Sequence, residues 1–330
     1  MKAIKFFAIT AMAAAMITSC SNEDELSQSN YPSDNIIRIT AGVNNAKTRA
    51  EGAAGTPLKN PLSLTVVNKN APKYTYVNQV FTKDENEVWK CSEAQPLLWQ
   101  NETTPVDIVA FAPAQGDKFN GVYAEGSIQP ITYSIAANQS TSSDNNDLLY
   151  YYAPGFVPKD KLVDKKLNIK MNHAFCMIDI VVTLGTEFNV SGIPTTSPIT
   201  EVTLGGTKID ATVDVTNTNN IVTTSSTDAA KDITATPGAF TKPENDNKEK
   251  PCISRFSCIA IPQTVGKNTF KVSLKTAGKL YKWTSAEQVV LQSGYRYTLE
   301  LTMGNNVVLL KDAISASPWG NGEGGSLETD

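Results

Sequence analysis

Strict alternation of apolar and polar residues recurs along this chain and restricts it to half-buried β-strands. The longest run covers residues 295–303, where Tyr, Leu or Met occupies every second position and Arg, Thr or Glu lies between. Successive side chains of a strand point to opposite faces, so this period places one face on a core and the other in water. The same pattern recurs in segments 37–43, 106–112, 167–171, 178–184, 209–215 and 270–274. No long stretch has helical spacing, so the sequence predicts an all-β fold.

The length of the chain and a charged run near its middle indicate more than one β-sandwich. A chain of 330 residues has room for two ordinary domains, and short antiparallel strands in a chain of this size are typical of sandwiches. The charged run 159–166 follows Pro154 and Pro158, and we interpret it as a linker between domains at 50–160 and 161–330. The polar stretches 216–230 and 242–250 are predicted surface loops.

Composition argues against several classes of function. The formal net charge is −4 and no Lys/Arg cluster is present, which disfavours nucleic acid as a partner. With one histidine in the chain, a zinc site is not expected, and no other metal or cofactor is predicted. Apart from Cys20, the cysteines lie in apolar, strand-like runs without paired spacing. We therefore favour buried free thiols for Cys91, Cys176, Cys252 and Cys258. Disulfides are the alternative, because an exported protein can be oxidised.

The N-terminus has the pattern of a bacterial lipoprotein signal. Lys2 and Lys5 precede the apolar run 6–17, which is too short for a permanent membrane span. The run ends in an aliphatic residue, two small residues and Cys20, which matches a lipobox. We therefore predict that residues 1–19 are a signal peptide and that the Cys20 thiol takes a diacylglyceryl group. The alternative is an ordinary secretory signal with a chance cysteine.

The segment after Cys20 is polar and acidic, so it cannot bury apolar surface and is predicted to be a disordered tether. Residues 21–25 resemble the surface-export signal of lipoproteins in gut-type anaerobes, although a solvated spacer is the alternative. We expect an outer-membrane lipoprotein exposed at the cell surface, anchored by its lipid and not by a spanning segment.

A set of motifs in order resembles the fimbrillin family, the subunits of type V pili. These motifs are Pro96-Leu97-Leu98-Trp99, Ala110-Phe111-Ala112-Pro113, Asp147-Leu148-Leu149-Tyr150, Asn172-His173-Ala174-Phe175, Ser293-Gly294-Tyr295-Arg296-Tyr297 and Pro318-Trp319. The resemblance spans most of the chain and implies two tandem transthyretin-like β-sandwiches, with a role in a fimbrium and in cell adhesion. One departure is Phe175-Cys176-Met177, where the family usually has a small polar residue and Lys.

The resemblance implies that the bond between Arg49 and Ala50 is a proteolytic maturation site. These residues precede the small-residue stretch 52–55. An arginine in a flexible loop is by itself an ordinary protease site. In fimbrillins an arginine at this place is cleaved by a trypsin-like, Arg-specific protease. The resemblance therefore implies that residues 20–49 are removed on maturation, so the lipid serves delivery to the surface before the protein enters a fimbrium.

Cleavage at this place would start assembly by strand exchange. The removed segment contains a predicted strand of the first domain, with Ile37, Ile39, Ala41 and Val43 on one face. Its release would open a sheet edge to a strand of another subunit, and such head-to-tail contacts generate filaments. The donor candidate is segment 305–319, with Val307, Val308, Leu309, Leu310, Ile314 and Trp319. Alternatively, Val307–Leu310 is the last core strand of its own sandwich.

Two other classes of protein compete with a pilus subunit. An enzyme is not expected: His173 begins an apolar strand, where a packed or hydrogen-bonded histidine is the ordinary interpretation, and no nucleophile elbow or phosphate loop is present. The alternative is a monomeric surface lipoprotein that binds glycans or another host or bacterial adhesion ligand. Its exposed aromatics would come from the tryptophans, although burial is the default for Trp89, Trp99 and Trp283, with Trp319 left open.

Overall fold

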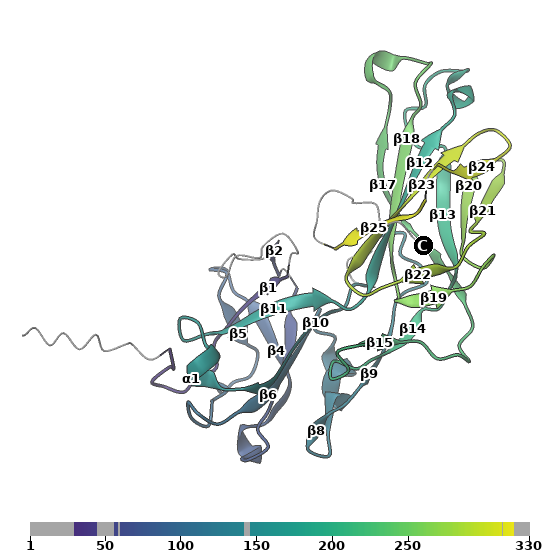
Figure 1. Ribbon diagram of the computed structural model, residues 1–330. Helices are drawn as coiled ribbons and strands as arrows, with labels where there is room; N and C mark the ends of the chain where they lie inside the picture. Colours follow the sequence, from purple (N-terminus) through teal and green to yellow (C-terminus); the bar gives the residue numbers. More distant parts are fainter. Residues whose placement is uncertain (1–29, 45–55, 59, 142–145, 312, 320–330) are drawn as a thin grey trace, which may run out of the picture.

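A computed structural model describes residues 30–44, 56–58, 60–141, 146–311 and 313–319. Strands dominate these residues, and their single α-helix is α1 (Pro158–Lys161), one turn long (Figure 1). The prediction of an all-β fold is confirmed. Strand β23 (Tyr295–Met303) coincides with the longest alternating run of the sequence, and its buried positions are the apolar residues of that run from Tyr297 onward.

One sheet forms the N-terminal lobe, which is drawn in purple to teal in Figure 1. Its eight strands, in spatial order, are β2 (Thr56–Pro57), β1 (Ile39–Val43), β11 (Leu167–His173), β10 (Leu149–Phe156), β6 (Val106–Ala112), β3 (Leu62–Val67), β4 (Tyr76–Lys83) and β5 (Trp89–Cys91). Strand β11 pairs with β10 only through its last two residues. Strands β1 and β11 then pack over the same core as β3 and β6.

Two sheets share the core of the C-terminal lobe. The larger consists of β17 (Thr236–Thr241), β18 (Ile253–Ala260), β12 (Cys176–Leu184), β23 and β24 (Val308–Leu310), with β25 (Ser315–Pro318) also paired to β23. The smaller consists of β16 (Lys231–Thr234), β13 (Ile199–Thr207), β20 (Lys271–Thr276) and β21 (Leu280–Thr284). Their inward apolar residues belong to one buried cluster, as expected for two packed sheets.

Short strands connect the two lobes. Strand β9 (Ile131–Ser134) comes from the N-terminal half of the chain but pairs with β14 (Asp210–Val213), which also pairs with β15 (Val222–Thr223). Strands β19 (Gln263–Val265) and β22 (Val289–Leu291) form a ribbon nearby, and β7 (Tyr123–Ala124) pairs with β8 (Ser127–Ile128) (Figure 1). The predicted loop 216–230 contains strand β15. Its Val222 is buried in the core of the C-terminal lobe, which is the larger of the two hydrophobic cores.

Strand β6 contributes side chains to both cores. Ile108 and Ala110 belong to the core of the N-terminal lobe, whereas Val109 and Phe111 belong to the larger core. The neighbouring strand β10 alternates in the same way, because Tyr151 packs against the first core and Tyr150 and Tyr152 against the second. These two strands are therefore a wall shared by two hydrophobic cores, and each face of the wall is apolar.

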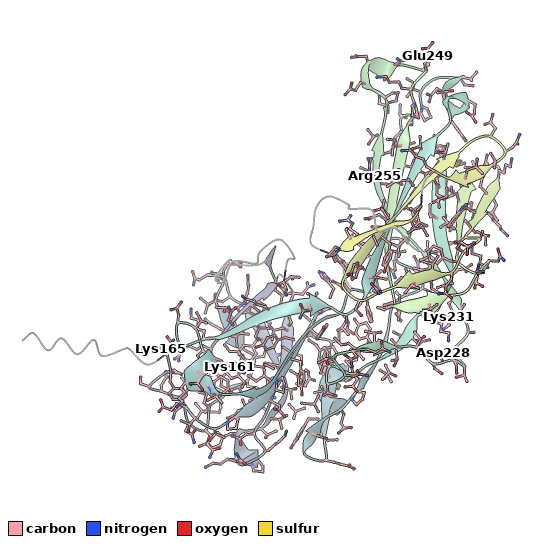
Figure 2. The ribbon with its side chains drawn as sticks, in the orientation of Figure 1. Lys161, Lys165, Asp228, Lys231, Glu249 and Arg255 are labelled. Atoms are coloured by element: carbon pink, nitrogen blue, oxygen red, sulfur yellow. The ribbon has the colours of Figure 1, made fainter. Side chains whose placement is uncertain are left out.

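The boundary expected between residues 160 and 161 falls inside the first sheet. Segment 157–166 connects β10 to β11 within that sheet, and its Lys161 and Lys165 are exposed (Figure 2). The chain passes from one core to the other after Met171, because Met171 packs in the first core and Ala174 in the second. Charge and proline content indicate solvent exposure, and this exposure is shared by a connection inside one domain and by a linker between two.

Candidate functional site

Strand β1 lies between β11 and β2 and is parallel to β11. Its residues pair in register from Ile39 opposite Leu167 to Val43 opposite Met171, while Gly42 and Val43 pair antiparallel with β2. The Asn44 amide donates to the Met171 carbonyl at 2.7 Å and extends the ladder with β11, while the Ile37 amide donates to the Leu97 carbonyl at 2.8 Å and ties the entry of the strand to a separate segment. Strand β1 is therefore an integral member of the sheet.

The apolar face of β1 covers the core of the N-terminal lobe. Ile37 and Ile39 are each 4% exposed, and Ala41 and Val43 are half-buried against the same cluster. Burial of an isoleucine side chain stabilises a fold by ~1.5–3 kcal/mol. The three inward residues of β11 that share this core, Leu167, Ile169 and Met171, are fully buried. Without β1, one backbone edge of β11 would lose its partners and this core would lose Ile37 and Ile39.

A surface ion pair precedes β1. Arg38 Nη1 donates to Asp34 Oδ1 at 2.9 Å, and the Asp34 side chain also accepts from the Ile36 amide at 3.1 Å. The hydrogen bond from Arg38 lowers the pKa of Asp34 well below its ordinary value. Both side chains are exposed, so the pair fixes the entry to β1 locally and adds little to stability. The predicted lipidation site Cys20 and the predicted cleavage site Arg49–Ala50 lie outside the described residues.

The C-terminal strands pack in their own lobe. Strand β24 pairs with the end of β23, at residues 301–303, and β25 pairs with its beginning, at residues 295–298, so the two short strands cover one edge of β23 in succession. Val308 is buried and Leu310 is half-buried, but Val307 and Leu309 are 50% and 58% exposed. Segment 307–310 is apolar in sequence on both faces, yet in this conformation only one face is covered.

The last described residues close over His173. The indole of Trp319 stacks on the imidazole with ring centroids 3.8 Å apart and planes 7° apart, and the Trp319 amide donates to the Gly294 carbonyl at 2.6 Å. His173 Nδ1 lies 2.8 Å from Asp147 Oδ2. The prediction of a packed or hydrogen-bonded histidine is confirmed, since His173 is both. Ile314, in the same C-terminal segment as Trp319, packs against the core of the C-terminal lobe. Nothing in the sequence pointed to Asp147 as the partner, because the pair is 26 residues apart.

The tryptophans and the cysteines differ in burial. Trp99 is 3% exposed, whereas Trp89 and Trp283 are half-buried against the two cores. All four described cysteines are unpaired, and Cys176, Cys252 and Cys258 are buried while Cys91 is half-buried. Burial raises the pKa of the Cys258 thiol to about 12 and that of Cys176 still further. Thiolates at these two positions are therefore suppressed at neutral pH.

Thiol chemistry gives a direct test of this burial. At pH 8 we expect Cys176 and Cys258 to resist iodoacetamide in the native protein, because the attacking thiolate is scarce when the pKa is raised and the sulfur is covered. Half-buried Cys91 should be alkylated faster, by roughly tenfold or more. Mass spectrometry of tryptic peptides before and after denaturation measures both. Equal labelling of Cys91 and Cys258 in the native state contradicts this packing.

The described part of the chain offers neither a metal centre nor a spanning helix. No group of three or more His, Cys, Asp or Glu side chains is arranged there to hold an ion. Among the same residues, no helix has the length and apolar character that crossing a membrane requires.

The architecture occurs in known proteins. Two solved structures share it: a candidate cell adhesion protein from Bacteroides ovatus, 17% identical with TM-score 0.60, and another from Bacteroides uniformis, 15% identical with TM-score 0.56. The first alignment covers 86% of this chain and 97% of the other, and the second covers 87% and 99%. Among proteins with curated functions, a search finds no match. At these identities the likeness defines the class by fold, an all-β protein of the kind seen in both structures.

The family follows from the sequence itself. Residues 48–319 match the model of the fimbrillin-like family, and these residues include every strand described here except β1. The chain belongs to the fimbrillin-like family. This confirms the resemblance based on the ordered motifs, and it associates the chain with the cell surface or fimbrium and with a structural or adhesive role.

Proposed function

We propose that the chain is a structural subunit of a surface pilus that is delivered as a lipoprotein and polymerised after proteolysis. The observation that carries the proposal is strand β1, which pairs along the whole of its length with β11 and buries Ile37 and Ile39 in the same core. It lies between the lipobox cysteine and Arg49 in the sequence. In this proposal Cys20 carries the lipid to the outer membrane. An Arg-specific protease then cuts the Arg49–Ala50 bond and separates β1 from the rest of the chain.

Loss of β1 creates an acceptor groove with a defined floor. Beside the vacated position lie Leu167, Ile169 and Met171, the inward side chains at every second position of β11, which share their core with the apolar residues of β1. The β11 backbone would also lose the partners that now pair with residues 39–43. A row of unpaired N–H and C=O groups beside apolar pockets is a template for another strand. An incoming strand with apolar residues at every second position would restore both kinds of contact.

The donor in this proposal is the C-terminal segment 305–319 of a neighbouring subunit. Strands β24 and β25 pair with β23 through only three and four residues, respectively. Val307 and Leu309 are already exposed, so moving this segment into a groove would bury apolar surface that its own lobe leaves in water. Because donor and acceptor lie at different places on the subunit, the contact is head-to-tail and generates a filament.

The alternative is a monomeric adhesion lipoprotein that keeps its lipid and its β1 strand. It predicts that the protein isolated from cells retains residues 20–49. The strand-exchange proposal predicts that the surface form begins at Ala50, so N-terminal sequencing of that form separates the two.

The experiment that tests the proposal uses the purified full-length precursor. After digestion with an Arg-specific protease, we expect a new N-terminus at Ala50 and filaments or ladders of oligomers in electron microscopy and gel filtration. The variant Arg49→Ala should stay monomeric under the same treatment, because its scissile bond is lost. The matched control is Lys47→Ala, two residues away, which leaves the arginine in place and should assemble normally. Equal assembly of the Arg49→Ala protein would refute strand exchange triggered at this bond.

A further inference from the structure

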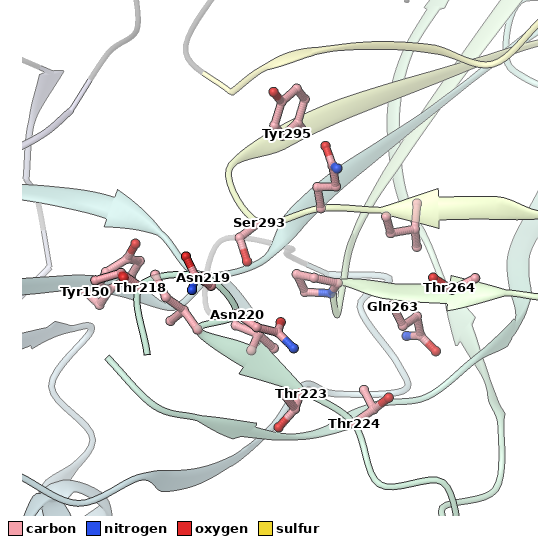
Figure 3. A pocket seen from close by; sticks show the side chains of 15 residues that line it. Tyr150, Thr218, Asn219, Asn220, Thr223, Thr224, Gln263, Thr264, Ser293 and Tyr295 are labelled. Atoms are coloured by element: carbon pink, nitrogen blue, oxygen red, sulfur yellow. The ribbon is translucent and has the colours of Figure 1, made fainter. Parts of the chain in front are cut away.

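A polar hollow lies where the two lobes meet. Its cavity volume is about 670 Å³, which is in the range of ordinary small-molecule sites, ~300–1,000 Å³. The wall comes from segment 218–224, from residues 262–264 at the start of β19, from the turn 291–295 between β22 and β23, and from Tyr150 of β10 (Figure 3). Four segments that are distant in sequence thus converge on one site.

The side chains around the hollow are uncharged and mostly polar, with Ile221, Val222, Pro262 and Leu291 as the aliphatic members. None of the described residues that line it is Asp, Glu, Lys, Arg or His. Hydroxyl groups come from residues such as Thr218, Thr223, Thr264 and Ser293, and amide groups come from asparagines and glutamines. An anionic ligand would find no counter-charge here, whereas strong recognition of carboxylate, sulfate or phosphate uses charged donors. An apolar strand would find few apolar pockets, so the hollow differs in chemistry from the groove beneath β1.

Part of this wall is held in place by hydrogen bonds to neighbouring segments. Gln263 Oε1 accepts from the Lys208 amide at 2.9 Å, and its Nε2 donates to the Ile261 carbonyl at 3.0 Å. The Gln292 amide donates to the Tyr297 hydroxyl at 2.9 Å, which fixes the turn beside the hollow. The Asp214 amide donates to the Ile221 carbonyl at 2.8 Å and closes the base of loop 214–221. The site is therefore largely formed before any ligand binds.

Other polar groups at the hollow are left for a ligand or water. The side chains of Thr218, Asn219, Thr223 and Ser293 form no hydrogen bond within the described part of the chain. Two half-buried tyrosines, Tyr150 and Tyr295, add aromatic surface at separate edges of the hollow (Figure 3). A tyrosine presents an apolar ring and a polar hydroxyl together. The wall thus offers uncharged donors and acceptors together with flat apolar faces.

We propose that this hollow is a binding site for a neutral oligosaccharide. A hexose ring carries hydroxyl groups that donate and accept around its edge, and its C–H faces pack on aromatic rings. Hydroxyl and amide side chains satisfy the first requirement without charge, and Tyr150 and Tyr295 satisfy the second. The inference specifies the ligand class for the adhesive role in the proposed function, but it does not require polymerisation.

The test uses the full-length Arg49→Ala protein, so failure of strand exchange leaves the assay unaffected. The protein is applied to an array of neutral oligosaccharides of hexose and N-acetylhexosamine units, beside sialylated and sulfated ones. We expect binding to neutral members, and the affinity for the best of them is then measured by calorimetry. Thr223→Ala and Asn219→Ala should each weaken binding about five- to tenfold, as expected for loss of one hydrogen bond.

The matched control is Thr132→Ala. Thr132, Thr212 and Thr223 are register partners across β9, β14 and β15, and all three are exposed, but only Thr223 lines the hollow. Thr132→Ala should bind as the parent protein does, and circular dichroism should be unchanged in all variants. The proposal is overturned if no neutral oligosaccharide binds, if charged saccharides or a second copy of the chain bind there instead, or if Thr132→Ala weakens binding as much as Thr223→Ala.

Discussion

Replacing Phe175 with alanine is expected to lower the free energy of unfolding by ~3–5 kcal/mol. Phe175 is fully buried where the chain leaves β11 for β12, and its ring lies 5.4 Å from that of Tyr133. Its carbonyl also accepts from the Gly294 amide at 2.9 Å, which ties the start of β12 to the turn before β23. Removal of the ring leaves a cavity among strands that cannot close on it without moving several sheets.

Urea unfolding followed by tryptophan fluorescence measures this loss. The matched control is Phe240→Ala, because Phe240 lies on the edge strand β17 and is half-buried. We expect the control to cost ~1 kcal/mol, near the centre of the range for single substitutions. Equal losses for the two variants would show that Phe175 is not the central packing residue described here.

The second large effect concerns Ile39. The variant Ile39→Asp places a carboxylate opposite Leu167, in a position that is 4% exposed and has no cation facing it among the described ion pairs. Burial of an unpaired charge costs several kcal/mol, so the variant should release β1 from the sheet instead of tolerating the charge. Hydrogen exchange of the β11 amides should rise by about a hundredfold or more, which corresponds to loss of ~3 kcal/mol of protection.

The adjacent residue supplies the control. Thr40 is exposed on the same strand, so Thr40→Asp adds the same charge without burying it, and β11 should stay protected. If the proposed function is correct, Ile39→Asp should also oligomerise before any cleavage, because its groove is already open. Protection of β11 in the Ile39→Asp protein would mean that β1 is not held by its apolar face.

Much of the fold could be predicted because alternation is a local property. The run 295–303 became β23, 106–112 became β6, and 178–184 lies within β12. Each strand was recognisable from its own residues, since the side chain of every second residue must enter a core. The pairing of strands was not recognisable in this way. Ile39 and Leu167 are neighbours across a parallel ladder, and no local pattern selects one partner strand over another.

The domain boundary and the hollow could not be predicted from local sequence either, because both depend on which strands pair. Lys161 and Lys165 correctly indicated exposure, but exposure does not distinguish a connection within a sheet from a linker. The hollow depends on residues such as Tyr150, Thr223 and Ser293, which come from separate strands and carry no motif. The motifs predicted the family because each is a short contiguous run of residues and their order along the chain can be seen in the sequence. The lipidation and cleavage sites stay predictions, since Cys20 and Arg49 lie outside the described residues.

The wall formed by β6 and β10 has a mechanical consequence. Because Ile108 and Val109, adjacent residues of one strand, anchor opposite cores, bending one lobe against the other would disrupt packing on both faces at once. Each molecule should therefore transmit tension as a single stiff link without an internal hinge. In a fibre made of such links, compliance would reside at the joints between molecules, and a pulling experiment should show extension there before either lobe unravels.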